Sequence, residues 1–296
     1  MTKAQFRFKT IVVATDLTDS GSCALRYAQK IAQQHESKLV IVYAIDPAGY
    51  AFPEGLPELA ASDRGAREIL SRIEEEIRQQ GIPVHSVVET GVIYEQILQA
   101  AHDHQADLLV LGTHAPEKVG RAALGTVARR LLATASCPIL TVPPAANANL
   151  ESRSPWRTVL VATDFSDTSL AALNHAQSVV GGQLVVIHVT SDPANQEQEH
   201  HLARLRFLAP FNESHTVPVA HFVVPGEAGL VIADHANRLS ADLVVLGSPL
   251  NELQEEDFHT STVLQVISNV NCPVLCVPPA RRVSEANVVK RLAVSH

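Results

Sequence analysis

The sequence predicts an α/β protein built from two tandem copies of one domain, each a five-stranded parallel sheet with helices on both faces. The first observation is an internal repeat, because residues 10–19 read TIVVATDLTD and residues 158–167 read TVLVATDFSD. The second is that short β-branched runs alternate with helical patterns in each copy, which is typical of parallel α/β sheets. The third is that the strand segments are almost continuously apolar, as strands covered on both faces must be.

The repeat extends over most of the chain. ADLLVLGT at 106–113 matches ADLVVLGS at 241–248, and CPILTVPP at 137–144 matches CPVLCVPP at 272–279. The matching segments of these two pairs are fewer residues apart in the chain than those of the first pair. The second copy is therefore shorter between its first and fourth strands. Such self-similarity is the signature of a duplicated structural unit.

Four regions are expected from this repeat. The first domain spans 1–146 and the second spans 156–280. Between them, residues 147–155 are polar and flanked by proline, which favours a linker. Residues 281–296 form a basic C-terminal tail.

The first copy shows each element in order. Strands are expected near 9–15, 39–45, 83–89, 107–112 and 138–143. Helices are expected near 20–35, 63–80, 92–104 and 125–135. In the first helix, Ala24, Tyr27, Ala28, Ile31 and Ala32 recur at i, i+3, i+4 spacing and form one apolar stripe. Residues 47–57 contain Gly and Pro and are predicted to form a loop at the edge of the sheet.

Composition excludes two classes of protein. With 23 basic against 31 acidic groups and a net charge of −8, the chain lacks the basic footprint of a nucleic-acid binder. The longest purely apolar run, Leu39 to Ile45, is far shorter than the ~20 residues of a membrane helix. The first residues, MTKAQFRFKT, also lack the apolar core of a secretory signal. We therefore expect a cytoplasmic protein with no nucleic-acid partner and no integral membrane association.

A candidate phosphate site follows the fourth strand. Ligands of open parallel sheets bind beyond the carboxyl ends of the strands, where the strand order reverses. After Gly112, the segment THAPEKVGRAAL leads to Gly125 and Thr126 at the start of a predicted helix. A glycine-bearing loop that enters a helix presents backbone N–H groups and the positive end of the helix dipole, which suits phosphate. Lys118 and Arg121 would add positive charge.

Three segments of the chain resemble the universal stress protein family. They are the ATD-[LF]-[ST] strand end, the G-T-H-A-x9-G-T segment and the closing CP-[IV]-L-x-VPP strand. The resemblance covers nearly all of both copies and is to tandem members of that family. It implies a Rossmann-like fold of the adenine nucleotide alpha-hydrolase-like type for each domain. Nucleotide-binding members carry G-x2-G-x9-G-[ST], which the first copy matches at Gly112, Gly125 and Thr126, with Ala115 at the middle glycine.

The resemblance also implies a ligand and its contacts. The ligand would be ATP, AMP or ADP, with any Mg²⁺ held through the phosphates. Adenine contacts would come from Ala14, Thr15, Asp16 and Ala44. Phosphate and ribose contacts would come from Gly112, Ala115, Gly125, Thr126 and Val127, with His114 close to the ligand.

Ala115 leaves an alternative open for the first copy. If the family glycine has a positive φ, an alanine there costs roughly 1 kcal/mol, and its methyl group could crowd a phosphate. The loop would then either bind nucleotide or keep its shape without a ligand.

The second copy departs further from the motif. Gly247 is followed by SPLNELQEEDFH, so Leu250 replaces the middle glycine and Thr260 replaces the third. This segment has no Lys or Arg, and its acidic residues would repel a phosphate. They are Glu252, Glu255, Glu256 and Asp257. We expect a solvated loop rather than a metal site, and no ATP binding in the second domain; the histidines elsewhere also lack a convergent zinc spacing.

Three functions are left open. The first is a stress-response regulatory protein whose first domain senses an adenine nucleotide and so biases the binding of an unknown regulatory protein partner. The second is a very slow ATPase, because neither a general base nor an arginine finger is evident and no catalytic residue is assigned. The third is a scaffold that needs no nucleotide, or a binder of another small molecule.

The resemblance implies how the two domains associate. Domains of this family pair through the fifth strand, which lies near 138–143 in the first copy and near 273–278 in the second. Two copies in one chain would thus form internally the dimer that single-domain members form between chains. Whether whole chains pair further as a homodimer is left open.

Overall fold

The computed structural model contains two similar sets of strands and helices. The structure describes residues 7–50, 56–113, 124–144, 146, 156–191, 197–210, 217–248 and 261–279. The first half contains β1 (Thr10–Ala14), α1 (Asp19–His35), β2 (Lys38–Ile45), the 3-10 turn η1 (Pro47–Tyr50), α2 (Leu56–Gln79), β3 (Val84–Thr90), α3 (Ile93–Asp103), β4 (Leu108–Gly112), α4 (Thr126–Thr134) and β5 (Ile139–Val142). The second half contains β6 (Thr158–Ala162), α5 (Asp167–Val179), β7 (Gln183–Thr190), α6 (Gln198–Leu208), β8 (Val219–Pro225), α7 (Ala228–Arg238), β9 (Leu243–Gly247), α8 (Thr262–Asn269) and β10 (Val274–Val277).

The predicted strands and helices of the first copy are confirmed, with one correction. Helix α2 begins at Leu56, so the predicted loop at 47–57 is shorter and the predicted helix at 63–80 starts too late. The turn η1 occupies 47–50 of that segment. Pro57 lies in the first turn of α2, where the missing N–H of proline removes no helical hydrogen bond.

Matching caps begin the first helix of each half. Thr18 precedes α1, and its side-chain oxygen accepts a hydrogen bond from the N–H of Gly21 at 3.4 Å. Ser166 precedes α5, and its hydroxyl accepts one from the N–H of Ser169 at 3.3 Å. A side-chain oxygen at this position satisfies an N–H group that has no partner within the helix. The TDLTD and TDFSD repeats therefore form the same strand-to-helix turn.

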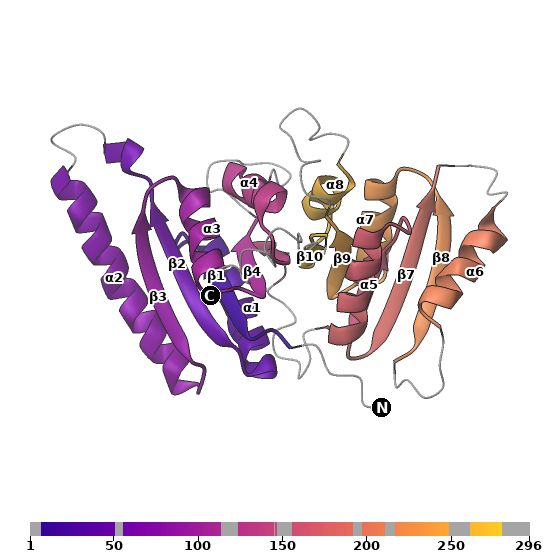
Figure 1. Ribbon diagram of the computed structural model, residues 1–296, viewed down its shortest axis with the longest axis horizontal. Coiled ribbons are helices and arrows are strands. Elements are labelled where there is room, and N and C mark those ends of the chain that lie inside the picture. The colour runs from indigo at the N-terminus through magenta and orange to yellow at the C-terminus, as the bar shows by residue number, and fades with distance from the viewer. Residues whose placement is uncertain are drawn as a thin grey trace, which may run out of the picture.

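The strands form one ten-stranded sheet in the order β3-β2-β1-β4-β5-β10-β9-β6-β7-β8 (Figure 1). Each half contributes five parallel strands. The halves meet at β5 and β10, the strands at which the resemblance placed domain pairing, and this pair is antiparallel. Leu140 lies opposite Leu275 in the register, and Ile139 lies opposite Cys276. The first strand within each half is central and the third lies at an outer edge.

Helices cover both faces of the sheet, and each face has one hydrophobic core. The first core lies under α1, α2, α5 and α6, and the second lies under α3, α4, α7 and α8. The predicted stripe of α1 is buried in the first core, with Tyr27 at 3% and Ile31 at 1% exposure. Each core contains residues from both halves, because β5 and β10 send alternate side chains to each face. Leu140 and Leu275 lie in the first core, and Ile139 and Cys276 lie in the second.

The junction between the halves should be sensitive to truncation of its buried side chains. Leu275 is 3% exposed and lies opposite Leu140. We expect Leu275→Ala to lower the free energy of unfolding by about 2–5 kcal/mol, because it leaves a cavity in a core shared by both halves. Urea denaturation followed by circular dichroism measures this change. The control Leu230→Ala, at a side chain that is 52% exposed, should change stability by less than about 0.5 kcal/mol; equal effects of the two variants would contradict the shared core.

Candidate functional site

The strand order reverses between β1 and β4 in the first half, and the expected site residues lie there. Continuing the register of β1 with β2 places Asp16 level with Ala44, since Ala14 lies opposite Val42. Continuing the register of β1 with β4 places Thr15 level with Gly112. The carboxyl ends of three neighbouring strands thus bring these residues into one row. This is the edge at which open parallel sheets bind ligands.

The turn that follows β1 is fixed by its own polar side chains. The N–H of Thr15 donates to the carbonyl of Val42 at 3.0 Å, which anchors the turn to β2. Leu17 has a φ of 61°, and its N–H donates to Thr15 Oγ1 at 3.1 Å. Asp16 Oδ1 accepts from the N–H of Thr18 at 3.0 Å and from its hydroxyl at 2.5 Å. The Asp16 carboxylate therefore shapes the turn with one oxygen.

A glycine in α1 allows these side chains to sit close to the helix. A Cβ atom at Gly21 would lie 2.7 Å from both Asp16 Oδ1 and Thr15 Oγ1. In the second half, Ser169 stands at the same place, and its hydroxyl lies 2.9 Å from Thr163 Oγ1. Thr15 and Asp16 therefore pack against α1 in space that a serine side chain occupies in the second half.

The beginning of α4 supplies the second part of the site. Gly125 is the N-cap, with an extended backbone at φ −62° and ψ 153°. The first helical hydrogen bond runs from the N–H of Arg129 to the carbonyl of Gly125 at 3.1 Å. The N–H groups of the three residues from Thr126 onward therefore precede the helical ladder, and glycine has no side chain to cap them. Figure 1 shows α4 at the same edge of the sheet as η1, where β2 ends.

Two of the expected contact residues are not among the residues that the structure describes. His114 and Ala115 lie outside the described residues, as do Lys118 and Arg121. Of the described candidates, Val127 packs against the second core, as does Ala14.

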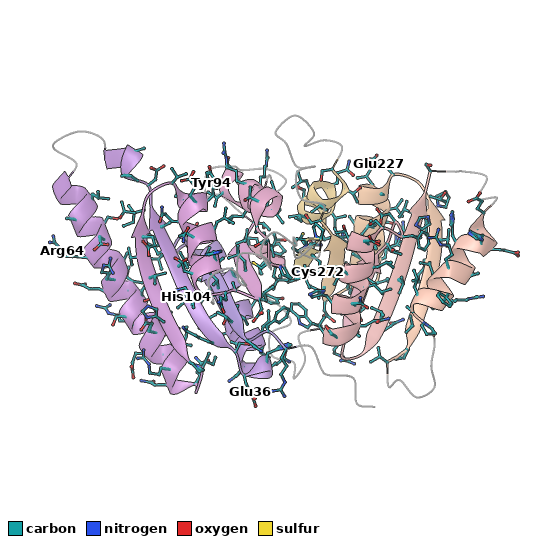
Figure 2. All side chains as sticks on the ribbon, in the orientation of Figure 1. Glu36, Arg64, Tyr94, His104, Glu227 and Cys272 are labelled. Atoms are coloured by element: carbon teal, nitrogen blue, oxygen red, sulfur yellow. The ribbon has the colours of Figure 1, made fainter. Side chains whose placement is uncertain are left out.

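Residues that the sequence did not single out hold the start of α4 in place. Arg129 Nε donates to the carbonyl of Leu124 at 3.0 Å, just before the N-cap. The guanidinium of Arg130 lies 5.0 Å from the centre of the Tyr94 ring, which joins α4 to α3. Figure 2 shows Tyr94 at the same edge of the molecule. Arginine at i+4 and i+5 from a glycine N-cap is too common a pattern to reveal this role in a sequence.

The second half repeats the strand-end turn. Asp164 Oδ1 accepts from the N–H of Ser166 at 2.9 Å and from its hydroxyl at 2.6 Å. Burial raises the pKa of Asp164, but the hydrogen bonds from Ser166 outweigh it, so this pKa lies below its ordinary value. Phe165 has a φ of 68°, as Leu17 does in the first half. Retention of the turn in both halves shows that it is a structural feature of each domain, so it does not by itself indicate a ligand.

The glycine at the end of β9 also has a packing role. A Cβ atom at Gly247 would lie 2.8 Å from the backbone nitrogen of Ser169 in α5. Gly247 is the counterpart of Gly112, so the first glycine of the motif is required for helix packing where the rest of the motif is lost. Ser248 follows it, is 3% exposed, and its hydroxyl has no hydrogen-bond partner among the described residues. The acidic segment that follows, including Leu250 and Thr260, lies outside the described residues.

The described residues contain neither a metal-binding cluster nor a membrane-spanning helix. No group of three or more His, Cys, Asp or Glu side chains within the described ranges is arranged to hold a metal ion. No helix in the described part of the chain combines the length and the apolar character needed to cross a membrane.

Comparison with known proteins identifies relatives of both halves. The model of the universal stress protein family matches residues 7–143 and 155–278. A universal stress protein of Methanocaldococcus jannaschii is 30% identical over 139 residues, which cover 46% of this chain and 82% of that protein. A universal stress protein of Mycolicibacterium smegmatis is 27% identical over 258 residues, which cover 80% of this chain and 86% of that protein.

Solved structures show the same fold over the whole chain. The crystal structure of a universal stress protein from Archaeoglobus fulgidus has a TM-score of 0.76 at 21% identity. It covers 93% of this chain and 100% of its own. A universal stress protein structure from Pseudomonas aeruginosa has a TM-score of 0.65 at 18% identity and covers 99% of this chain. The tandem arrangement of two Rossmann-like domains is thus shared with these proteins.

The buried hydroxyl of Ser248 allows a test of whether the end of β9 contains an unsatisfied polar group. A buried hydroxyl without a partner destabilises the folded state, so Ser248→Ala should leave stability unchanged or raise it by up to about 1 kcal/mol. As a control, Ser37→Ala should lower stability by about 1 kcal/mol, because the buried Ser37 hydroxyl donates to the carbonyl of Phe8 at 2.7 Å. Urea denaturation compares the variants. A clear loss of stability in Ser248→Ala would contradict this expectation and show that the hydroxyl has a hydrogen-bond partner.

Proposed function

Because this chain belongs to the universal stress protein family, we propose that its first domain binds ATP or a related adenine nucleotide as part of a stress response. The second domain, on this proposal, binds no nucleotide and serves as the structural partner of the first. Nucleotide binding would bias one arrangement of the loop between β4 and α4 and so regulate the binding of a protein partner. The cytoplasm is the compartment that we propose for this activity.

The observation that carries the proposal is the convergence of strand ends and a helix N-terminus. Thr15, Asp16, Ala44 and Gly112 share one row at the reversal of strand order. The proposed adenine contacts lie in this row and at Ala14. Both the row and α4 belong to the side of the molecule where nucleotides bind in open α/β sheets.

The proposed phosphate contacts come from the start of α4. The N–H groups of Thr126 and Val127 precede the first helical hydrogen bond, so they can donate to phosphate oxygens together with the Thr126 hydroxyl. Gly125 keeps the approach open because it carries no side chain. His114 and Ala115, which belong to the loop before α4, are proposed contacts on the resemblance alone.

Magnesium would be held chiefly by the nucleotide on this proposal. Asp16 is the carboxylate that the candidate row contains, and its Oδ1 already accepts two hydrogen bonds from Thr18. Mg²⁺ is commonly bound through substrate phosphates with one or two carboxylates. Asp16 Oδ2 would thus supply at most one ligand, directly or through water.

The two domains would have different roles. The uncapped start of α8, where Ser261 makes no side-chain cap, resembles that of α4, so helix geometry alone does not distinguish the two crevices. What distinguishes them is the sequence between Gly247 and Ser261, which contains four acidic residues and no Lys or Arg, whereas the first copy has Lys118 and Arg121 in the matching segment. Like charges would oppose a nucleotide there.

Calorimetry on nucleotide-free protein tests the proposal. We expect ATP or AMP to bind with a dissociation constant in the millimolar range or lower. Gly125→Leu should weaken this binding at least about tenfold, because the leucine side chain would obstruct the N–H groups at the start of α4. Gly125 has an extended backbone, which leucine also adopts, so this variant should fold.

Ser261→Leu is the matched control. It places the same side chain at the N-cap of α8 in the second half. We expect the nucleotide affinity of this variant to equal that of the wild type. Absence of binding to the wild type, or equal weakening by both variants, would contradict the proposal.

A further inference from the structure

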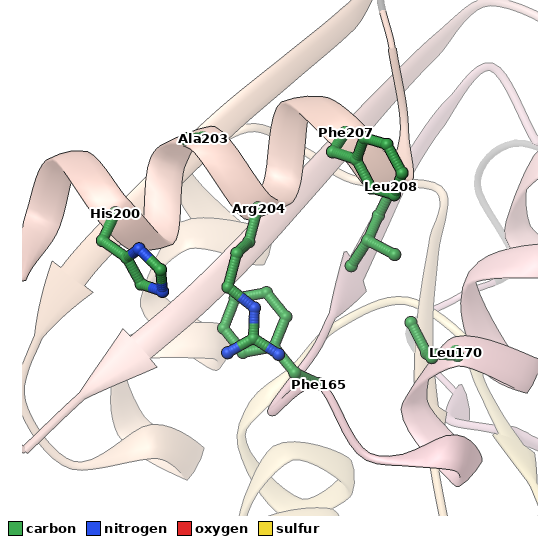
Figure 3. A pocket seen from close by; sticks show the side chains of 7 residues that line it. All are labelled: Phe165, Leu170, His200, Ala203, Arg204, Phe207 and Leu208. Atoms are coloured by element: carbon green, nitrogen blue, oxygen red, sulfur yellow. The ribbon is translucent and has the colours of Figure 1, made fainter.

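A cavity of about 460 Å³ lies between α5 and α6 in the second half (Figure 3). We call it the α5–α6 cavity. Its apolar walls come from Phe165, Leu170, Phe207 and Leu208, and Arg204 and His200 are its polar side chains. Ligand pockets of proteins have this order of volume and the same mixture of apolar walls with a few polar groups.

The base of the cavity is a fixed aromatic cluster. The guanidinium of Arg204 lies 3.8 Å from the centre of the Phe165 ring. The Phe165 ring also contacts two histidine rings. The distance between ring centres is 4.5 Å to His188 and 5.8 Å to His201. The His188 ring is itself anchored, because its Nδ1 donates to the carbonyl of Thr163 at 2.8 Å. The Phe165 ring therefore packs against the Arg204 guanidinium and two histidine rings.

Arg204 gives the cavity a positive charge without a matching carboxylate. Among the residues that the structure describes, none forms an ion pair with Arg204. Two carboxylates of the neighbouring segments have other partners, since Asp164 Oδ1 accepts from Ser166 and Glu197 lies 3.5 Å from His201. Burial lowers the pKa of His188, the ring beside Phe165. Among the residues that line the cavity, Arg204 is the one that carries a permanent positive charge.

Phe207 is a second and independent indication of a ligand. Its side chain is 85% exposed although it lines the cavity. Four other large apolar side chains are exposed among the described residues, and they range from 38% to 52%. An aromatic ring exposed to this degree beside an apolar cavity marks a surface that a ligand can cover.

We propose that the α5–α6 cavity binds a small aromatic carboxylate. The carboxylate would accept paired hydrogen bonds from the Arg204 guanidinium, whose planar fork matches its geometry. The His200 imidazole can donate a further hydrogen bond. The aromatic body of the ligand would pack between Phe207 and Leu170, where it would remove the exposed phenyl ring from water.

The residues and helix that form the cavity differ from their counterparts in the first half. Leu17 stands in the first half where Phe165 stands in the second, and both residues have a positive φ. The counterpart of α6 is α2, which has 24 residues against 11 in α6. The shorter helix and the phenyl ring together distinguish this place from its counterpart in the first half.

The cavity is also separate from the proposed nucleotide site. Phe165 and Leu208 pack against the first core, under α5 and α6. Ala14 and Val127 of the proposed nucleotide site pack against the second core, on the other face of the sheet. The proposal for the cavity therefore does not depend on nucleotide binding.

Titration of the full-length protein with three probe acids tests the proposal. The probes are phenylacetate, 3-phenylpropionate and indole-3-acetate, with phenylacetamide and acetate as the neutral and the non-aromatic comparisons. We expect at least one probe acid to bind in the millimolar range or tighter by calorimetry and saturation-transfer NMR. Phenylacetamide and acetate should each bind at least about tenfold more weakly, because each lacks one of the two recognition features. Saturating ATP should leave the affinity unchanged.

Variants on α6 locate the binding. Arg204→Met keeps the length of the side chain and should weaken binding at least about tenfold. Arg206→Met removes the same charge from the same helix but does not line the cavity, so affinity should stay within about twofold. Ala203→Trp should abolish binding by filling the cavity, and thermal unfolding checks that all three variants fold. Failure of all three acids to bind, equal binding of phenylacetamide, or equal effects of Arg204→Met and Arg206→Met would each overturn the proposal.

Discussion

The antiparallel pairing of β5 with β10 is the contact on which the rest of the structure depends. It joins two parallel half-sheets into one sheet, and its alternate side chains enter both cores. The Thr141 hydroxyl also donates to the carbonyl of Val274 at 3.3 Å across this junction. Without the pairing, β5 and β10 would be exposed edge strands, which are prone to association with other chains. Duplication within one chain therefore removes two edges and fixes the positions of both domains.

The two domains combine a shared framework with different crevices. The same turn follows β1 and β6, with Asp16 and Asp164 making equivalent hydrogen bonds. Gly247 shows that even a motif glycine can be kept for the packing of a helix against a strand end. The features proposed to recognise ligands are instead local to one half. They are the glycine N-cap of α4 in the first half and the cluster around Phe165 in the second.

The sequence was sufficient to predict the strands of the first half, because most of them are apolar β-branched runs bounded by polar or glycine residues. It also predicted the buried face of α1, where Tyr27 and Ile31 follow the helical period. It placed the start of α2 too late, since the polar segment after Pro57 shows no apolar period. The α5–α6 cavity was not predictable, because it depends on the close approach of Phe165 and Arg204, which lie on different elements.

Hydrogen exchange with and without saturating ATP tests the central claim, that the two domains share a fold but only the first recognises an adenine nucleotide. The account predicts added protection at the amides that follow β1 and at those of Thr126 and Val127 in the first turn of α4. It predicts no added protection at Thr262 in the first turn of α8 or after β6. Protection confined to the second half, or equal protection of α4 and α8, would contradict the account.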